Sequence, residues 1–334
     1  MAPLPFWSII FIVSLAALII SADFFIKAAE RIGLALGIPP FVIGITLVAV
    51  GTSLPELVTS IAAVLSPTDA SQIVIGNVIG SNITNMGLVL GLVAVLARRI
   101  RLTFDVMRVD LPMMLGATFL LYLTIKDLTF SLVEGLMCLA GMAVYLGYVL
   151  NLSKKNPAEA AEAAVIPELD LDPGAELGEA PISWKDPVTL IASGAVIYFS
   201  AKYNVLAIEE LATMLNIGKE FIALTVVALG TSLPELVVSI AAIRTDNAEM
   251  AVGNVLGSNI FNIFAVMGIP RLFGALDIPE SVLAFSLPLL LVTTLLCLFI
   301  LQDKEVNRWE GFMLLLLYLL FIVNLATQEV YTPG

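Results

Sequence analysis

The chain has 334 residues, of which 59% are hydrophobic and only 13% are charged, and its formal net charge is −12. Soluble domains carry about 25% charged residues, so this composition indicates an integral membrane protein. The acidic balance, without a basic patch that carries interleaved aromatic residues, argues against a nucleic-acid partner. Histidine is absent and the two cysteines lie in apolar runs. These features disfavour iron, copper and zinc chemistry and leave hard cations bound by oxygen ligands.

Ten apolar segments of the chain are long enough to cross a membrane as helices. In chain order they are expected near residues 6–26, 40–64, 72–97, 108–125, 128–150, 187–208, 219–243, 249–270, 280–301 and 309–327. No charged region precedes the first apolar run, so we expect it to be retained as a span and not cleaved as a signal peptide. The longest polar stretch, residues 151–186, is rich in Ala, Glu, Asp and Pro and is expected to be an acidic cytoplasmic linker.

The distribution of lysine and arginine over the loops predicts the orientation of the chain. If the N-terminus lies outside, four of these residues fall in outer loops: Lys126, Lys202, Lys219 and Arg271. The other twelve then fall in inner loops: Lys27, Arg31, Arg98, Arg99, Arg101, Arg108, Lys154, Lys155, Lys185, Arg244, Lys304 and Arg308. Because inner loops of membrane proteins carry the excess of positive charge, we expect both termini outside.

The octapeptide GTSLPELV occurs twice, at Gly51–Val58 and at Gly230–Val237. It belongs to a longer repeated block that shares 15 of 20 positions between residues 44–63 and 223–242. A second block, with GNVIGSNITN in one copy and GNVLGSNIFN in the other, shares 10 of 20 positions between residues 73–92 and 250–269. Chance does not produce two such blocks in the same order, so the chain contains an internal repeat.

The repeat divides the chain into two halves, residues 1–150 and 187–334, on either side of the linker. Each half contains five expected spans, and an odd number forces the halves to insert with opposite orientations. The predicted fold is therefore an all-α polytopic membrane protein with ten transmembrane helices in two inverted five-helix repeats. In such a fold, the substrate site is expected near the middle of the membrane, where the halves meet.

Each copy of the octapeptide places a glutamate, Glu56 or Glu235, inside an apolar span. Insertion of a carboxylate at this depth costs several kcal/mol of free energy, so such a residue is rarely present without a function. The pair therefore indicates a cation site shared by the two halves of a transporter. The prolines and glycines of the motif predict a break or kink in the helix near Gly51–Pro55 and Gly230–Pro234. Carbonyl oxygens freed by such a break would be good ligands for sodium or calcium.

Spacing supports a cation site, because four pairs of polar residues are separated by one helical turn: Thr52 and Glu56, Thr231 and Glu235, Ser81 and Asn85, and Ser258 and Asn262. Together they offer carboxylates, hydroxyls and amide oxygens without a cationic side chain, which is the ligand set of a hard cation. The formal charge of −2 matches one divalent ion or two monovalent ions.

Simpler interpretations exist for some of these residues. Any one hydroxyl in a membrane helix often bonds only to its own backbone. Gly76 and Gly80, like Gly253 and Gly257, have the spacing of glycines that serve close helix packing. Other acids near the ends of the expected spans, such as Glu30 and Asp110, are expected at the membrane interface.

The doubled sequence GTSLPE followed by GNVxGSNxxN, in a chain with ten expected spans, resembles the sodium/calcium exchanger family of calcium:cation antiporters, in its compact prokaryotic form. The resemblance implies that calcium is held by the side chains of Thr52, Glu56, Thr231 and Glu235. It implies overlapping sodium sites that use, besides these threonines and glutamates, Ala49, Ser53, Ser81, Ala228, Ser232 and Ser258. Asn85 and Asn262 would complete a central position.

The resemblance further implies a sodium/calcium antiporter in the cell (inner) membrane of a prokaryote, with the first and sixth helices sliding to switch access. Calcium and sodium are then the transported ions, and neither a cofactor, an enzymatic activity nor an obligatory protein partner beyond the lipid bilayer is expected. Asparagine at both central positions disfavours potassium cotransport, because relatives that carry potassium tend to have an acid there. Calcium/proton exchange on the same scaffold stays open, since paired buried carboxylates can also carry protons. A cation channel is a third hypothesis, but inverted repeats with a broken helix in each half fit alternating access better than they fit a channel.

Overall fold

Helices make up nearly all of the computed structural model, which describes residues 4–36, 38, 40–65, 72–155, 183–214, 232–280 and 282–331. The first half contains α1 (Leu4–Ala35), α2 (Pro40–Ile43), η1 (Gly44–Val48), α3 (Ala49–Val64), α4 (Gln72–Thr84), η2 (Asn85–Leu90), α5 (Gly91–Ala97), α6 (Asp110–Ile125) and α7 (Leu132–Lys155). The second contains α9 (Lys185–Met214), α11 (Leu233–Arg244), α12 (Ala248–Phe261), η3 (Asn262–Val266), α13 (Met267–Arg271), η4 (Val282–Ser286), α14 (Leu287–Leu301) and α15 (Arg308–Tyr331). The η segments are π-helical.

Seven helical stretches in the described part of the chain are long and apolar enough to cross a membrane: Leu4–Gly33, Phe41–Val64, Ile73–Ala97, Leu132–Val149, Ala248–Arg271, Val282–Leu301 and Arg308–Leu325. Each coincides with an expected span. The spans expected near 108–125 and 187–208 are the helices α6 and α9. Of the span expected near 219–243, only the part in α11 lies within the described residues, and the linker is described only at its two ends.

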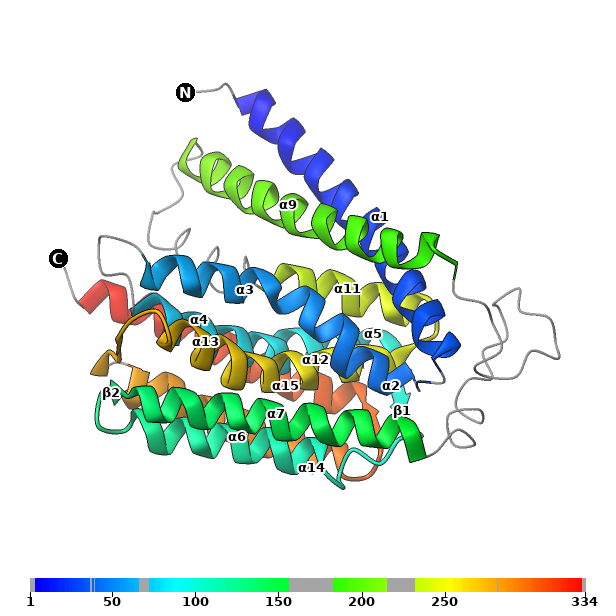
Figure 1. Ribbon diagram of the computed structural model, residues 1–334. Helices are drawn as coiled ribbons and strands as arrows, with labels where there is room; N and C mark the ends of the chain where they lie inside the picture. The colour runs from blue at the N-terminus through cyan, green and yellow to red at the C-terminus, as the bar shows by residue number, and fades with distance from the viewer. Residues whose placement is uncertain are drawn as a thin grey trace.

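Two short β-ribbons connect loops at opposite ends of the helical bundle. Strand β1 (Arg99–Arg101) pairs with β4 (Glu305–Asn307), and β2 (Thr129–Phe130) pairs with β3 (Leu276–Asp277), both antiparallel. The hydropathy pattern, read as helices alone, did not predict these strands. The first ribbon joins two loops expected inside and the second joins two expected outside. The start of α1 and the end of α15 both lie at the β2 end of the bundle (Figure 1). Loops expected on the same side of the membrane therefore lie at the same end of the bundle, and the orientation of the chain in the membrane stays a prediction.

The helices that carry the repeated motifs occupy the centre of the bundle. In the most apolar window of Ala248–Arg271, 94% of the residues are buried, and the value for Ile73–Ala97 is 78%. The corresponding value is only 22% for Leu132–Val149 and for Arg308–Leu325, whose side chains form the outer surface. Because these outer helices are apolar, their exposed faces are suited to contact with lipid.

Glycines allow the two halves to approach closely in this centre. A Cβ atom on Gly44 of η1 would lie 2.3 Å from the Met250 carbonyl oxygen of α12. On α12, a Cβ on Gly253 would lie 2.4 Å from the Phe41 carbonyl oxygen, and one on Gly257 would lie 2.4 Å from that of Ile45. No larger residue fits at these positions, so the prediction of close packing is confirmed for Gly253 and Gly257. It is wrong for Gly76 and Gly80, where an added Cβ would meet no described atom within 4 Å.

Helices α1 and α9 form a pair that lies along one side of the bundle (Figure 1). Arg31 of α1 forms an ion pair of 3.5 Å with Asp186 at the start of α9. Toward the other end, the side-chain amide of Asn204 donates to the Phe11 carbonyl oxygen at 3.2 Å and to the Ser14 hydroxyl at 3.1 Å. These contacts hold the two helices to each other at both ends.

Candidate cation site

The first copy of the octapeptide lies within α3, which continues through Gly51 and Pro55 without a break. The first copy therefore contains no break, and a kink there stays a prediction. A proline removes one backbone hydrogen bond but does not end a helix that neighbouring segments hold in place. The irregular backbone lies one turn earlier, in the π-helical segment η1, which leads directly into Ala49. Ala49, Thr52, Ser53 and Glu56 are all buried on α3.

The second copy is described from Ser232 onward, and Ala228 and Thr231 lie outside the described residues. Ser232 is the N-cap residue of α11, with φ −91° and ψ 9°, and Pro234 follows in the first turn. A proline is well accommodated there, because the first backbone N–H groups of a helix have no acceptor within it. Glu235 stands in the same turn, so it projects from the beginning of α11, whereas Glu56 projects from the middle of α3.

The two glutamates meet at the contact between α3 and α11. The Ser53 hydroxyl of the first half donates to Glu235 Oε1 of the second half at 3.1 Å. Glu56 is 1% exposed and Glu235 is 0% exposed. Neither takes part in the ion pairs found in the described part of the chain. The structure therefore brings together two buried carboxyl groups, one from each copy of the motif, and no cationic side chain of the described residues pairs with them.

Three of the four carboxyl oxygens have no hydrogen-bond partner among the described residues. They are Oε1 and Oε2 of Glu56 and Oε2 of Glu235. A buried polar atom without a partner is costly, and an ionised one is far more so. These oxygens are therefore suited to a bound cation, which would supply the missing interaction.

Two asparagines that the sequence reasoning did not single out support the glutamate-bearing helices. The Asn77 amide on α4 donates to the Glu56 carbonyl oxygen at 3.2 Å and to the Ser60 hydroxyl at 3.1 Å. The Asn254 amide on α12 makes the equivalent contacts to the Glu235 carbonyl oxygen at 3.4 Å and to the Ser239 hydroxyl at 3.0 Å. The signal was present in the sequence, because both asparagines follow the first glycine of the second repeated block.

Thr52 connects the two halves through one of these asparagines. Its hydroxyl lies 3.2 Å from Asn254 Oδ1 and 3.1 Å from the Val48 carbonyl oxygen of its own helix. The simpler interpretation, a hydroxyl bonded to its own backbone, is thus correct for Thr52 but incomplete. Asn254 contacts both Thr52 and the backbone of Glu235, so it fixes the spacing of α3 and α11 at the site.

The predicted central residues Asn85 and Asn262 are fully buried, and each begins a π-helical segment, η2 or η3. The Asn262 amide donates to Asn82 Oδ1 at 3.1 Å, and the Asn82 amide donates to the Asn259 carbonyl oxygen at 3.2 Å. Both side-chain polar atoms of Asn85 and Oδ1 of Asn262 have no partner in the described part of the chain. π-Helical turns widen a helix locally and are frequent at functional sites.

The other predicted ligands within the described residues, Ser81, Ser232 and Ser258, are also buried. The Ser81 hydroxyl on α4 lies 3.4 Å from Asn77 Oδ1. The hydroxyls of Ser232 and of Ser258 on α12 have no partner among the described residues. No three acidic, histidine or cysteine side chains gather in the described ranges. A cation held here would therefore rely on the two carboxylates and on neutral oxygens.

Two acids expected at the membrane interface lie at helix ends, but their side chains are buried. The Asn247 amide donates to Glu30 Oε1 at 2.6 Å, and the Tyr145 hydroxyl donates to Asp110 Oδ1 at 3.0 Å. The sequence did not predict this burial, because a segment distant in sequence supplies each partner. Glu30 thereby attaches α1 to the loop before α12.

Substitution of Asn254 by Ala is expected to lower the apparent calcium affinity about tenfold, because Glu235 loses its support and Thr52 loses its acceptor. Asn77→Ala should act in the same direction, since its amide makes the equivalent contacts to Glu56 and Ser60. The measurement is the calcium dependence of uptake by the reconstituted protein. Asn307→Ala, which removes an asparagine on β4 away from the motifs, is the control and should leave the affinity unchanged. An unchanged affinity in either motif variant would contradict the supporting role of these asparagines.

Comparison with known proteins identifies relatives over nearly the whole chain. The family model described as sodium/calcium exchanger protein matches residues 6–151 and 185–327. The sodium/calcium exchanger MaX1 of Methanosarcina acetivorans is 36% identical and is aligned over 95% of this chain and 97% of its own. The inner membrane protein YrbG of Escherichia coli is 33% identical over 78% of each chain. Among solved structures, the sodium-calcium exchanger NCX_Mj superposes with a TM-score of 0.76 at 30% identity, over 95% of this chain and 98% of that chain.

Proposed function

Because the chain belongs to the sodium/calcium exchanger family, we propose that it exchanges sodium for calcium across a prokaryotic cell membrane by alternating access. The observation that carries this proposal is the pair of buried glutamates, one from each repeat, whose carboxyl oxygens lack partners in the described part of the chain. Their combined formal charge of −2 balances one calcium ion or two sodium ions. A site of oxygen ligands without histidine or cysteine suits these hard cations.

The proposed ligands follow the positions predicted from the motifs. Calcium is held by Thr52, Glu56, Thr231 and Glu235. Sodium uses the same glutamates and threonines at overlapping positions, together with Ala49, Ser53, Ser81, Ala228, Ser232 and Ser258. Asn85 and Asn262 form the central position. The contact between Ser53 and Glu235, and that between Thr52 and Asn254, support a site built from both halves.

The proposed scaffold has ten membrane helices in two inverted repeats, residues 1–150 and 187–334, with residues 151–186 as a cytoplasmic linker. The equivalent contacts of Asn77 and Asn254 and the π-helical turns that begin at Asn85 and Asn262 support this relation between the halves. Both termini would lie outside, and the name of the Escherichia coli relative supports an inner-membrane location.

Competition for the same two carboxylates couples the two ions. Calcium and sodium cannot occupy the glutamates together, so one leaves when the other binds. The transition between outward- and inward-open states is allowed only when the charge of −2 is neutralised, because moving uncompensated charge through a dry barrier is costly. In this mechanism, α1 and α9 slide together along the central helices, since their mutual contacts hold them as a pair.

The test is uptake of calcium-45 into sodium-loaded proteoliposomes that are diluted into sodium-free buffer. We expect uptake that requires internal sodium and responds to membrane potential. Uptake without internal sodium, driven instead by an acid interior, would replace this proposal with calcium/proton exchange. Calcium flux that continues without any counter-ion gradient would indicate a channel. A protein that gives no calcium flux in any of these conditions contradicts the proposal altogether.

A further inference from the structure

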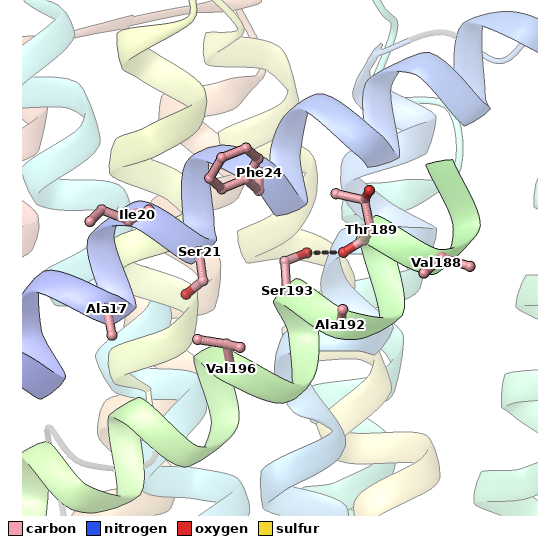
Figure 2. Close-up of a pocket in the computed structure, with 9 residues that line it drawn as sticks. All are labelled: Ala17, Ile20, Ser21, Phe24, Val188, Thr189, Ala192, Ser193 and Val196. Carbon is pink, nitrogen blue, oxygen red and sulfur yellow. Dashed lines mark hydrogen bonds between the residues drawn. The ribbon is translucent and has the colours of Figure 1, made fainter. Parts of the chain in front are cut away.

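An apolar groove lies between α1 and α9, outside the candidate cation site. It encloses about 530 Å³ and is lined by Ala17, Ile20, Ser21, Phe24, Val188, Thr189, Ala192, Ser193 and Val196. Figure 2 shows these side chains along the neighbouring stretches of the two helices. On α1 the groove lies inside the segment that is long and apolar enough to cross a membrane. A molecule in the groove would therefore be within reach of the lipid bilayer.

The groove offers apolar surface and is open at the side. The Ser21 hydroxyl donates to the Leu18 carbonyl oxygen at 3.1 Å, and that of Ser193 donates to the Thr189 carbonyl oxygen at 2.6 Å. These hydroxyls are thus committed to their own helices. Ile20, Phe24 and Val188 are each more than half exposed, so they contact whatever surrounds the bundle. A hydrocarbon chain matches such a surface, because it needs no hydrogen-bond partner.

One end of the groove is basic. Along α1, Ile20, Phe24, Lys27 and Arg31 follow at spacings of three and four residues, so they share one face of the helix. On α9, Lys185 stands one turn before Val188 and Thr189 of the groove wall. The ion pair between Arg31 and Asp186 places these two helix ends beside each other.

The basic end has the composition of a membrane interface. Lys27 and Lys185 are exposed, and neither belongs to the ion pairs found in the described part of the chain. Trp184, which precedes α9, is 73% exposed. Exposed tryptophan next to lysine is typical of the level of the lipid head groups. Charge predicts that this end faces the cytoplasm, and the cytoplasmic leaflet carries the anionic lipids.

We propose that this groove binds an anionic phospholipid, with one acyl chain between α1 and α9 and the phosphate of its head group beside Lys27 and Lys185. The apolar walls, the side opening and the two lysines at one end fit the two parts of such a lipid. Its binding would set the separation of the paired helices. The inference depends on the membrane location of the chain but not on sodium/calcium exchange.

The test is the association of spin-labelled phosphatidylglycerol and spin-labelled phosphatidylcholine with the full-length protein in phosphatidylcholine vesicles. We expect the protein to select phosphatidylglycerol, by about fivefold for each lysine that contacts the head group. The double variant Lys27→Gln/Lys185→Gln should lose this selectivity. Ala192→Phe, which fills the groove, should remove the motionally restricted phosphatidylglycerol.

Two matched variants serve as controls. Lys202→Gln removes another exposed lysine of α9, and Ala195→Phe adds the same bulk at an exposed position of α9 outside the groove. Both should bind phosphatidylglycerol as the unmodified chain does. No selectivity in the unmodified chain, or equal behaviour of the groove variants and the controls, would overturn the proposal. Because the readout is lipid binding and not ion flux, failure of this proposal and failure of calcium exchange are distinguishable.

Discussion

Glu56→Gln and Glu235→Gln are each expected to lower sodium-dependent calcium uptake at least about 100-fold. Each substitution leaves one carboxylate to balance a divalent ion, and an excess charge in the membrane interior costs about 2.5–3.5 kcal/mol or more. The shape of the side chain is kept, so the effect reports the charge. The measurement is the initial rate of calcium-45 uptake into sodium-loaded proteoliposomes.

Stability separates this loss of function from a loss of fold. The carboxyl oxygens of Glu56 have no partner in the described part of the chain, so an uncharged amide should leave the unfolding temperature unchanged or raise it. Glu280→Gln makes the same chemical change at an exposed position and should affect neither uptake nor stability. Uptake within twofold of the unmodified chain for either site variant would show that the paired carboxylates do not carry calcium.

Gly253→Ala and Gly257→Ala are each expected to reduce the free energy of unfolding by about 1–3 kcal/mol. The added Cβ would stand 2.4 Å from a backbone oxygen of the first half, a contact that no side-chain rotation relieves. The helices must therefore move apart. Because α12 also carries Asn254, which contacts Thr52, calcium uptake should fall together with stability.

The matched control is Gly147→Ala on α7, where an added Cβ meets no described atom within 4 Å. Alanine favours a helix over glycine by roughly 0.5–1 kcal/mol, so this variant should be as stable as the unmodified chain or slightly more stable. Unfolding in detergent, followed by circular dichroism, gives the comparison. Equal changes in the free energy of unfolding for the Gly147 and Gly257 variants would show that the close crossing of η1 and α12 does not contribute to the stability of the fold.

Much of the architecture follows from local patterns in the sequence. The apolar runs predict the helices, because a backbone in hydrocarbon must satisfy its hydrogen bonds within each segment. Most bounds agree with the structure within a few residues, but α1 continues to Ala35, nine residues beyond the expected span. The doubled motif singled out Glu56 and Glu235, because a carboxylate is conspicuous within an apolar run. The family resemblance named the ligand set, and the comparisons confirm the family. The assignment of ligands stays a prediction.

Other features depend on contacts between segments distant in sequence. Pro55 predicted a break or a kink, yet α3 continues through it without a break, and the irregular turn lies upstream in η1. The support of Glu56 by Asn77, the burial of Glu30 against Asn247 and the pairing of β1 with β4 also involve separate segments.

The sequence by itself determined the class of protein, the repeat and the two glutamates, because hydropathy and motif identity are properties of short segments. Only the tertiary structure decided that Ser53 contacts Glu235 across the two halves and that Asn254 joins Thr52 to the second half. It also decided which carboxyl oxygens lack a partner in the described part of the chain. The physical reason is that hydrogen bonding between helices depends on the angle at which they cross and on the rotation of each helix about its axis. Close packing at glycines such as Gly44 and Gly257 sets this geometry, and no local sequence pattern specifies it.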